Sequence, residues 1–129
     1  MKLTSEDVTD IQQLYAAYCH LIDEGRSEEF ADLFVPEGSI ESGGSAVAGT
    51  EKLAAFAESV PGATPGIRHV TLNVMVEGGG DEAEGRAYLF AYTSSKEGTV
   101  VRATGVYRDS FRRVDGTWKY VARRFTMDR

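Results

Sequence analysis

The chain has 129 residues, of which 42% are hydrophobic and 26% charged, and its net charge is −6. This size and composition are typical of one globular domain, which we expect to span residues 1–129. The net negative charge argues against nucleic-acid binding, and the absence of a long apolar run argues against a membrane span. A single cysteine excludes an internal disulfide. Together with an N-terminus that does not resemble a leader, it leads us to expect a cytoplasmic protein.

Helix signals dominate the first half of the chain. Thr4 and Asp7 have the spacing of a capping box, and Gly25 is a typical C-terminal stop. Ser27 is expected to cap a second helix that ends at Pro36. The expected elements are helices from the Thr4 cap to about 23, over 28–34 and over about 50–59, with a hairpin of short strands over 38–41 and 46–48.

The sequence period changes to two after a loop rich in glycine and proline over 61–66. Asp115 and Gly116 give the strongest hairpin signal. Residues 61–129 hold eleven basic and eight acidic side chains interleaved with apolar ones, which indicates a solvated sheet face. The expected strands, forming a four-strand antiparallel meander in an α+β domain, are 67–77, 82–94, 99–114 and 117–126. Strands this long could curve around the first helix and leave a cavity.

The first helix has one buried stripe with Tyr18 at its centre and His20 on the opposite, solvated side. Asp23 lies in the last turn, where the helix dipole disfavours a negative charge. Either Asp23 belongs to a solvated turn, or its carboxylate works beside Tyr18. This stretch alone favours the solvated turn.

The first long strand leaves a similar choice. Its two faces carry His69, Thr71, Asn73 and Met75 on one side, and Val70, Leu72, Val74 and Val76 on the other. In one interpretation the aliphatic face is the core and His69 is in solvent. In the other, His69 and Asn73 line a cavity, and the aliphatic face packs against a second subunit.

The sequence lacks a phosphate loop, zinc-ligand spacing, a nucleophile elbow and a dinucleotide fingerprint, so we expect no cofactor and no metal. Arg123 and Arg124 point to opposite faces of the last strand, and which of them faces the cavity stays open. The tyrosines of the strands are either core residues or, if they gather, contacts for an apolar organic ligand.

Several stretches carry a resemblance to a known family, and they run nearly end to end: 10–15 with Tyr18 and Asp23, 30–34, 68–73, 105–109, and 115–118 with 123–124. In this order and spacing the chain resembles the SnoaL-like group of the nuclear-transport-factor-2-like superfamily. The resemblance implies a cone-shaped α+β barrel, with three N-terminal helices packed on a curved antiparallel sheet.

The placement of Tyr18, Asp23 and His69 is similar to a narrower set: bile-acid 7-alpha-dehydratase, hexachlorocyclohexane dehydrochlorinase and scytalone dehydratase. The resemblance implies that Asp23 orients His69, that His69 is the general base, and that Tyr18 contacts the substrate carbonyl or leaving group. Arg123 falls where the dehydrochlorinase has a pocket arginine. The chain departs from that enzyme in having tyrosine rather than lysine at Tyr18, and from scytalone dehydratase in lacking a second sheet histidine. The expected substrate-binding residues are Tyr15, Asn73, Tyr88 and Tyr107.

These features predict a cofactor-independent lyase or isomerase that acts on an apolar, polycyclic or polyketide-like small molecule. An Asp–His pair with no neighbouring nucleophile suits proton transfer rather than acyl transfer. The alternative is a catalytically silent binding or assembly module on the same fold, as in the β subunits of ring-hydroxylating dioxygenases. If His69 faces a cavity, the aliphatic face of its strand is exposed, so we also expect a homodimer formed through the outer sheet face.

Overall fold

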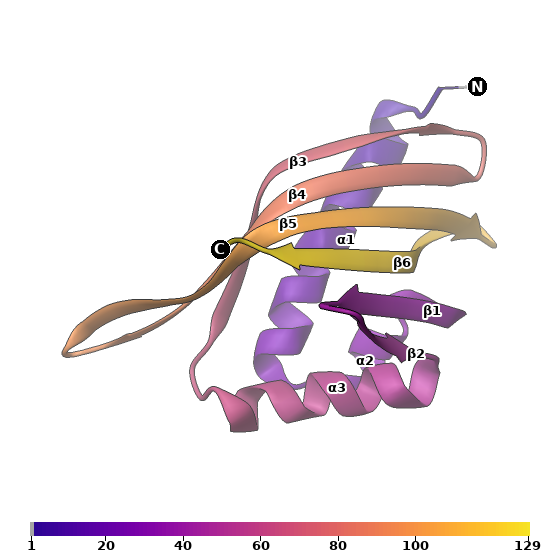
Figure 1. Cartoon of the computed structure of the whole chain (residues 1–129). Coiled ribbons are helices and arrows are strands. Elements are labelled where there is room, and N and C mark those ends of the chain that lie inside the picture. Colours follow the sequence, from indigo (N-terminus) through magenta and orange to yellow (C-terminus); the bar gives the residue numbers. More distant parts are fainter. Residues whose placement is uncertain (1) are drawn as a thin grey trace.

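The structure, a computed structural model, describes residues 2–129 (Figure 1). Its elements in chain order are α1 (Ser5–Glu24), α2 (Ser27–Ala31), β1 (Phe34–Ser42), β2 (Ser45–Ala48), α3 (Thr50–Ala63), β3 (Arg68–Gly79), β4 (Glu82–Ser95), β5 (Gly98–Val114) and β6 (Thr117–Met127). No helix among these residues is both long and apolar enough to span a membrane.

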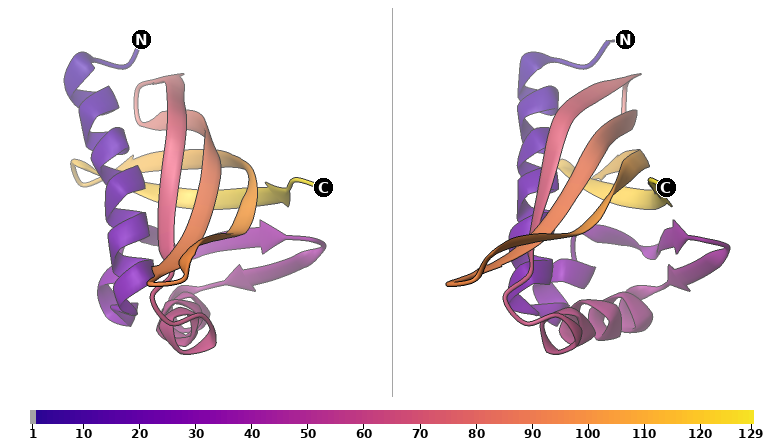
Figure 2. Two further views of the ribbon diagram at one scale, coloured as in Figure 1. Left: turned by 90° about the vertical axis from the view of Figure 1, so that its left-hand side faces the viewer. Right: turned by 60° about the vertical axis from the view of Figure 1, so that its left-hand side comes forward.

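One curved six-strand sheet has the order β2-β1-β6-β5-β4-β3 and is antiparallel except between β1 and β6. Helix α1 lies along one face of this sheet and α3 lies across one end, while the β4–β5 hairpin extends beyond the body (Figures 1 and 2). The predicted fold class is confirmed, although the sheet is open rather than a closed barrel. The β1–β2 hairpin is not separate, because β1 joins the meander through its parallel pairing with β6.

The predicted first helix is confirmed, including its caps. The Asp7 backbone N–H donates to Thr4 Oγ1, and the Thr4 backbone N–H donates to the Asp7 carboxylate. Gly25 closes the helix in the left-handed conformation, at φ 67°. The Asp7 carboxylate also accepts hydrogen bonds from Arg113 and Trp118, so the start of α1 is tied to β5 and β6. The stripe that contains Tyr18 is buried and His20 is exposed.

One predicted cap and two predicted helix ends are wrong. Ser27 is the first residue of α2, whose N-cap is Arg26 and has no side-chain cap hydrogen bond. The second helix stops at Ala31, because Phe34 already begins β1 and the Leu33 carbonyl accepts a hydrogen bond from Tyr120 N–H of β6. Pro36 therefore lies within β1. The third helix continues through Pro61 to Ala63, four residues beyond its predicted end.

A β-bulge in β3 changes which side chains face the core. Asn73 has φ 55°. Leu72 pairs with Tyr88 and Met75 pairs with Arg86, so β3 has one more residue than β4 between these two pairs. One extra residue turns every following side chain to the other face. Val74 and Val76 consequently pack against the main core, whereas Met75 is 60% exposed. The prediction that all four aliphatic residues of this strand face outward is wrong for these two valines.

Candidate functional site

Asp23 and His69 lie side by side where the last turn of α1 meets the start of β3. Asp23 Oδ1 is 2.6 Å from His69 Nδ1, and both Asp23 carboxylate oxygens accept from the His69 backbone N–H at 3.1 Å. The two side chains are only 14% and 13% exposed. Asp23 is therefore held by a strand that lies far away in sequence, and it does not sit in a solvated turn.

This geometry determines what the imidazole can do. A carboxylate at Nδ1 favours the tautomer with its proton on that nitrogen, which leaves Nε2 as a hydrogen-bond acceptor. If Nε2 takes a proton, the adjacent carboxylate stabilises the imidazolium. The backbone contact fixes the Asp23 carboxylate as well, so the pair is preorganised for general acid–base chemistry.

A second charged group, Arg123, is completely buried in the core. Its Nε and Nη2 donate to the two Asp109 carboxylate oxygens at 2.8 and 3.0 Å. The Tyr15 hydroxyl donates to Asp109 Oδ2 at 2.6 Å. Burial acts to lower the pKa of the Arg123 guanidinium, but Tyr120 and Asp109 outweigh it and hold this pKa above its ordinary value. Arg123 is thus a permanent cation in an apolar interior.

Four tyrosine rings surround the Arg123 guanidinium. Its central carbon lies 3.5 to 5.2 Å from the ring centroids of Tyr107, Tyr18, Tyr120 and Tyr15. These distances are in the range of cation–π contacts. Burial raises the pKa of the Tyr18, Tyr107 and Tyr120 phenols, so they are neutral hydrogen-bond donors at ordinary pH.

Two buried polar atoms of this cluster have no hydrogen-bond partner among residues 2–129. They are Arg123 Nη1 and the Tyr120 hydroxyl. Buried donors are almost always paired in native proteins, with protein groups, water or a ligand. The cluster can therefore offer a cationic N–H to the oxygen of a water or of a bound molecule.

Cys19 is a buried residue whose thiol is affected by both charged sites. Its sulfur lies 4.0 Å from Thr71 Oγ1, two residues beyond His69 on the same strand. Burial raises the pKa of the Cys19 thiol, while Arg123 acts to lower it and Asp23 acts to raise it. The pKa of the Cys19 thiol therefore responds to both charged groups, with opposite signs.

An apolar cluster lies next to His69 on the inner face of the sheet. Leu89, Ala91 and Tyr107 form it, with Ile67, Ala103 and Phe125 packed against them. Ala91 is the register partner of His69. Gly105 leaves no room for a Cβ under the Phe125 ring, which explains why the smallest residue occurs there. One member of the apolar cluster, Ala91, is therefore the cross-strand neighbour of His69.

Most of the predicted site residues lie inside. Asp23 and His69 meet, and Tyr15, Tyr18, Tyr107 and Arg123 form one buried cluster. Arg124 is 72% exposed, which settles that Arg123 is the inward arginine.

Two predicted substrate-binding residues, Tyr88 and Asn73, lie outside the inner cluster. Tyr88 is 54% exposed because it lies opposite Leu72 on the outer face, and Asn73 is exposed at the β3 bulge. Tyr15 is inside, but its hydroxyl is engaged by Asp109 and so supports Arg123.

Sequence reasoning missed Asp109 and Tyr120. Asp109 lies between Tyr107 and Phe111 on the inward face of its strand, and an acidic residue between two buried aromatic residues of one face signals a buried partner. Tyr120 occupies an inward position of the last strand, beside Trp118.

Surface pockets occur elsewhere on the molecule. Three of them, of about 880, 660 and 320 Å³, are lined by residues other than Asp23, His69 and Arg123. The candidate site is defined by its side-chain chemistry and not by any of these pockets. Among residues 2–129, no three His, Cys, Asp or Glu side chains are grouped so as to hold a metal ion.

Comparison with known proteins agrees with this architecture. Rv3472 from Mycobacterium tuberculosis, a protein of unknown function, is 30% identical with a TM-score of 0.88 over 95% of this chain and 72% of its own. Aln2 from a Streptomyces species is 27% identical with a TM-score of 0.87, over 98% and 94%. A candidate scytalone dehydratase from Novosphingobium aromaticivorans is 22% identical with a TM-score of 0.80, over 95% and 84%, and shares the fold.

No curated protein matches the chain. The family model for the SnoaL-like domain matches residues 3–124, almost the whole chain. The structural neighbours include proteins described as having an NTF2-like, cystatin-like fold. The protein therefore belongs to the SnoaL-like family.

Proposed function

We propose that the protein is a cofactor-independent lyase or isomerase that moves a proton on an apolar, polycyclic or polyketide-like small molecule. The observation that carries this proposal is the 2.6 Å contact between Asp23 and His69 in a largely buried setting. It leaves Nε2 of His69 as the basic nitrogen, and no serine or cysteine nucleophile is needed.

In the proposed reaction, His69 Nε2 removes a proton from the carbon next to a substrate carbonyl. The electron pair of that C–H bond moves onto the carbonyl oxygen, giving an enolate. In an elimination the enolate then expels a β hydroxyl, and the His69 imidazolium returns its proton to the leaving oxygen. In an isomerisation the imidazolium instead protonates a different carbon. Asp23 stabilises the imidazolium in both cases.

Arg123 and Tyr18 are the proposed partners of the developing oxyanion. Arg123 Nη1 is a buried cationic donor without a partner among the described residues, and the Tyr18 ring lies 4.2 Å from the guanidinium centre. Donors aimed at a developing negative oxygen in an apolar interior contribute strongly to catalysis. The apolar cluster of Leu89, Ala91 and Tyr107 supports an apolar substrate.

A silent binding or assembly module remains the second candidate, and one observation favours it. Arg123 is fully buried and paired with Asp109, as expected of an ion pair that only supports the fold. In that case the interior would bind an apolar ligand without turnover.

The test is proton exchange at the substrate carbon. The wild type and the His69→Ala and Asp23→Asn variants are incubated in D₂O with a panel of hydroxy-ketosteroids and polyketide-type ketones. NMR then follows deuterium uptake and elimination. We expect about 10²–10⁴-fold slower exchange in both variants, with melting temperatures close to that of the wild type. His20→Ala, which removes the exposed histidine of α1, should leave the rate unchanged.

Equal rates in the wild type and the His69→Ala variant would exclude the Asp–His pair as the catalytic base. Binding of panel members by thermal shift without exchange in any variant would instead establish the silent module.

A further inference from the structure

The charges of the Arg123 cluster are balanced within the chain before any ligand binds. Both Asp109 carboxylate oxygens accept hydrogen bonds from Arg123, and Oδ2 also accepts from the Tyr15 hydroxyl. The side chains of Arg123 and Asp109 are both 0% exposed. A carboxyl group that accepts at both oxygens acts as an ionised carboxylate. The buried pair therefore carries one positive and one negative charge, which cancel.

The donors that remain free in this cluster suit a single oxygen atom. Arginine recognises a carboxylate through two parallel N–H···O bonds, and Asp109 already occupies Nε and Nη2 of Arg123 in this way. Nη1 and the Tyr120 hydroxyl are left without a partner among the described residues. The Tyr120 ring lies 4.9 Å from the guanidinium carbon. One hydrogen-bond acceptor from a ligand can therefore use this site.

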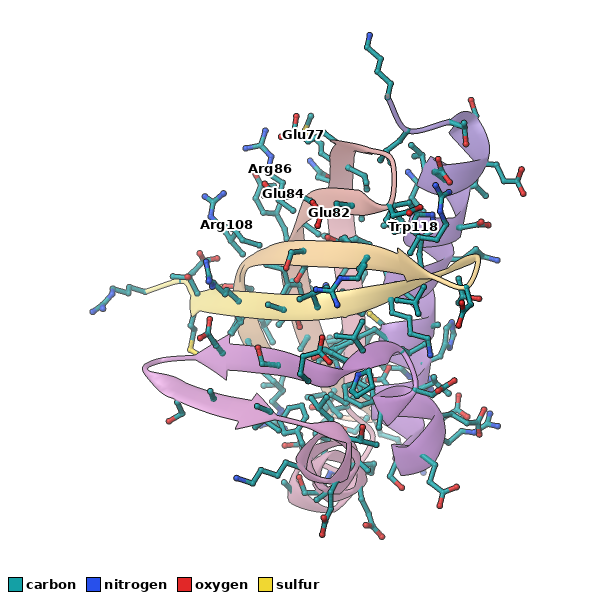
Figure 3. All side chains as sticks on the ribbon, turned by 90° about the vertical axis from the view of Figure 1, so that its right-hand side faces the viewer. Glu77, Glu82, Glu84, Arg86, Arg108 and Trp118 are labelled. Atoms are coloured by element: carbon teal, nitrogen blue, oxygen red, sulfur yellow. The ribbon has the colours of Figure 1, made fainter. Side chains whose placement is uncertain are left out.

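The arginines of the outer face, which is turned away from α1, are in a different setting. Arg86 and Arg108 are exposed and point away from α1 (Figure 3). Arg124 is 72% exposed and pairs with Glu41 at 2.8 Å. Water and salt screen charges at such positions, so an additional carboxylate nearby changes the free energy little. A carboxylate beside buried Arg123 would instead be a second negative charge without a cation of its own, which is strongly disfavoured.

We propose that Asp109 makes the Arg123 site selective for the neutral oxygen of a ketone, ester or amide, and excludes a carboxylate. This inference rests on the proposed function in one respect, that the substrate oxygen binds at Arg123 Nη1. It adds the class of substrate, a neutral carbonyl compound. Asp109 is a specificity-determining residue that acts through the charge of Arg123 and does not need to touch the substrate.

The proposed proton transfer favours the same class of substrate. When His69 removes a proton from a neutral ketone, an enolate and an imidazolium form together, so the net charge of the interior does not change. The enolate lies beside Arg123 and the imidazolium beside Asp23. A substrate that brings a carboxylate to Arg123 would add one uncompensated negative charge before the reaction and during it.

A matched pair of ligands tests the selectivity. 2-Naphthamide and 2-naphthoate share one ring system and nearly one shape but differ in charge, and ligand-observed NMR titration gives the dissociation constant of each. We expect the wild type to bind the amide at least about tenfold more tightly than the carboxylate. Asp109→Asn leaves Arg123 with an unneutralised charge, so it should gain affinity for the carboxylate and reduce this ratio at least about tenfold.

Glu41→Gln is the matched control, because it frees the exposed Arg124 from its carboxylate in the same way. This control should leave the ratio unchanged. Asp109→Ser, which removes the same charge and leaves room for water, is the second variant if Asp109→Asn does not fold. A wild type that binds both ligands equally, or neither of them, would overturn the proposal. A folded Asp109 variant with the wild-type ratio would also overturn it.

Deuterium exchange of the methyl group of 2-acetylnaphthalene, measured on the same samples, separates this proposal from the proposed reaction. Selective binding of the amide without exchange in the wild type would support the selectivity and contradict the reaction. Exchange in the wild type together with equal binding of the amide and the carboxylate would support the reaction and overturn the selectivity.

Discussion

The two faces of the sheet differ in how their charged side chains are paired. On the inner face, Arg123 and Asp109 are completely buried and joined by two hydrogen bonds, and Asp23 and His69 meet at 2.6 Å. On the outer face, Arg86 and Arg108 lie opposite each other, and neither forms an ion pair with a carboxylate among residues 2–129. Successive residues of the same strands supply both faces. The inner charges are paired with each other inside the fold, whereas Arg86 and Arg108 on the outer face are exposed and solvated.

Among changes to the inner face, we expect removal of Arg123 to have the largest effect on stability. The Arg123→Ala variant leaves the Asp109 carboxylate buried without its cation, and we expect a loss of about 3–5 kcal/mol in the free energy of unfolding. Urea denaturation measures this loss. Arg124→Ala removes the next arginine from the outer face, where it is 72% exposed, and should change the free energy by no more than about 1 kcal/mol. Similar losses in both variants would contradict the contrast between the faces.

Alkaline pH probes the inner face through its tyrosines. Burial raises the pKa of Tyr18, Tyr107 and Tyr120, and burial together with Asp109 raises that of Tyr15. The unfolded chain ionises its tyrosines near pH 10 and so loses protons before the native state does. Stability is therefore fully present below about pH 10 and declines above it, by about 1.4 kcal/mol per pH unit for each buried tyrosine.

Tyrosinate absorbance measures this alkaline transition. We expect the signal of the four inner tyrosines to appear only as the protein unfolds, which circular dichroism follows on the same sample. Ionisation of all six tyrosines in the folded protein would show that the inner cluster is open to solvent.

We expect a smaller loss of stability when a single hydroxyl group is removed from the inner cluster. Tyr15→Phe removes the hydroxyl that donates to Asp109 at 2.6 Å, and we expect a loss of about 1–3 kcal/mol in the free energy of unfolding. Tyr120→Phe is the matched control, because the Tyr120 hydroxyl is buried without a partner among the described residues. That control should be neutral or slightly stabilising. Equal losses would mean that the Tyr15–Asp109 hydrogen bond contributes little.

Local features of the fold could be predicted from the sequence because neighbouring residues determine them. The capping box of Thr4 and Asp7, the Gly25 stop and the Asp115–Gly116 turn are all found in the structure. Their signals are short-range hydrogen bonds and backbone preferences, which do not depend on the rest of the chain. The parallel pairing of β1 with β6 has no such signal, because its partners are far apart in the sequence.

The candidate site was predictable only in part, for the same reason. Asp23 and His69 could be proposed together through a resemblance, and the structure places them in contact. The partnership of Asp109 with Arg123 was missed. Counting back from the Asp115–Gly116 turn pairs Asp109 with Ala122, but a bulge between Ser110 and Phe111 moves Asp109 opposite Arg123.

The sequence by itself determined the caps of α1, the Asp115–Gly116 turn, the type of most elements and the family. The tertiary structure alone decided which side chains face inward beyond each bulge. The bulge at Asn73 turns Val74 and Val76 toward the core, and the bulge after Ser110 brings Asp109 to Arg123. The physical reason is the two-residue period of a strand: one inserted residue exchanges the faces, and its position depends on contacts with the neighbouring strands and with α1.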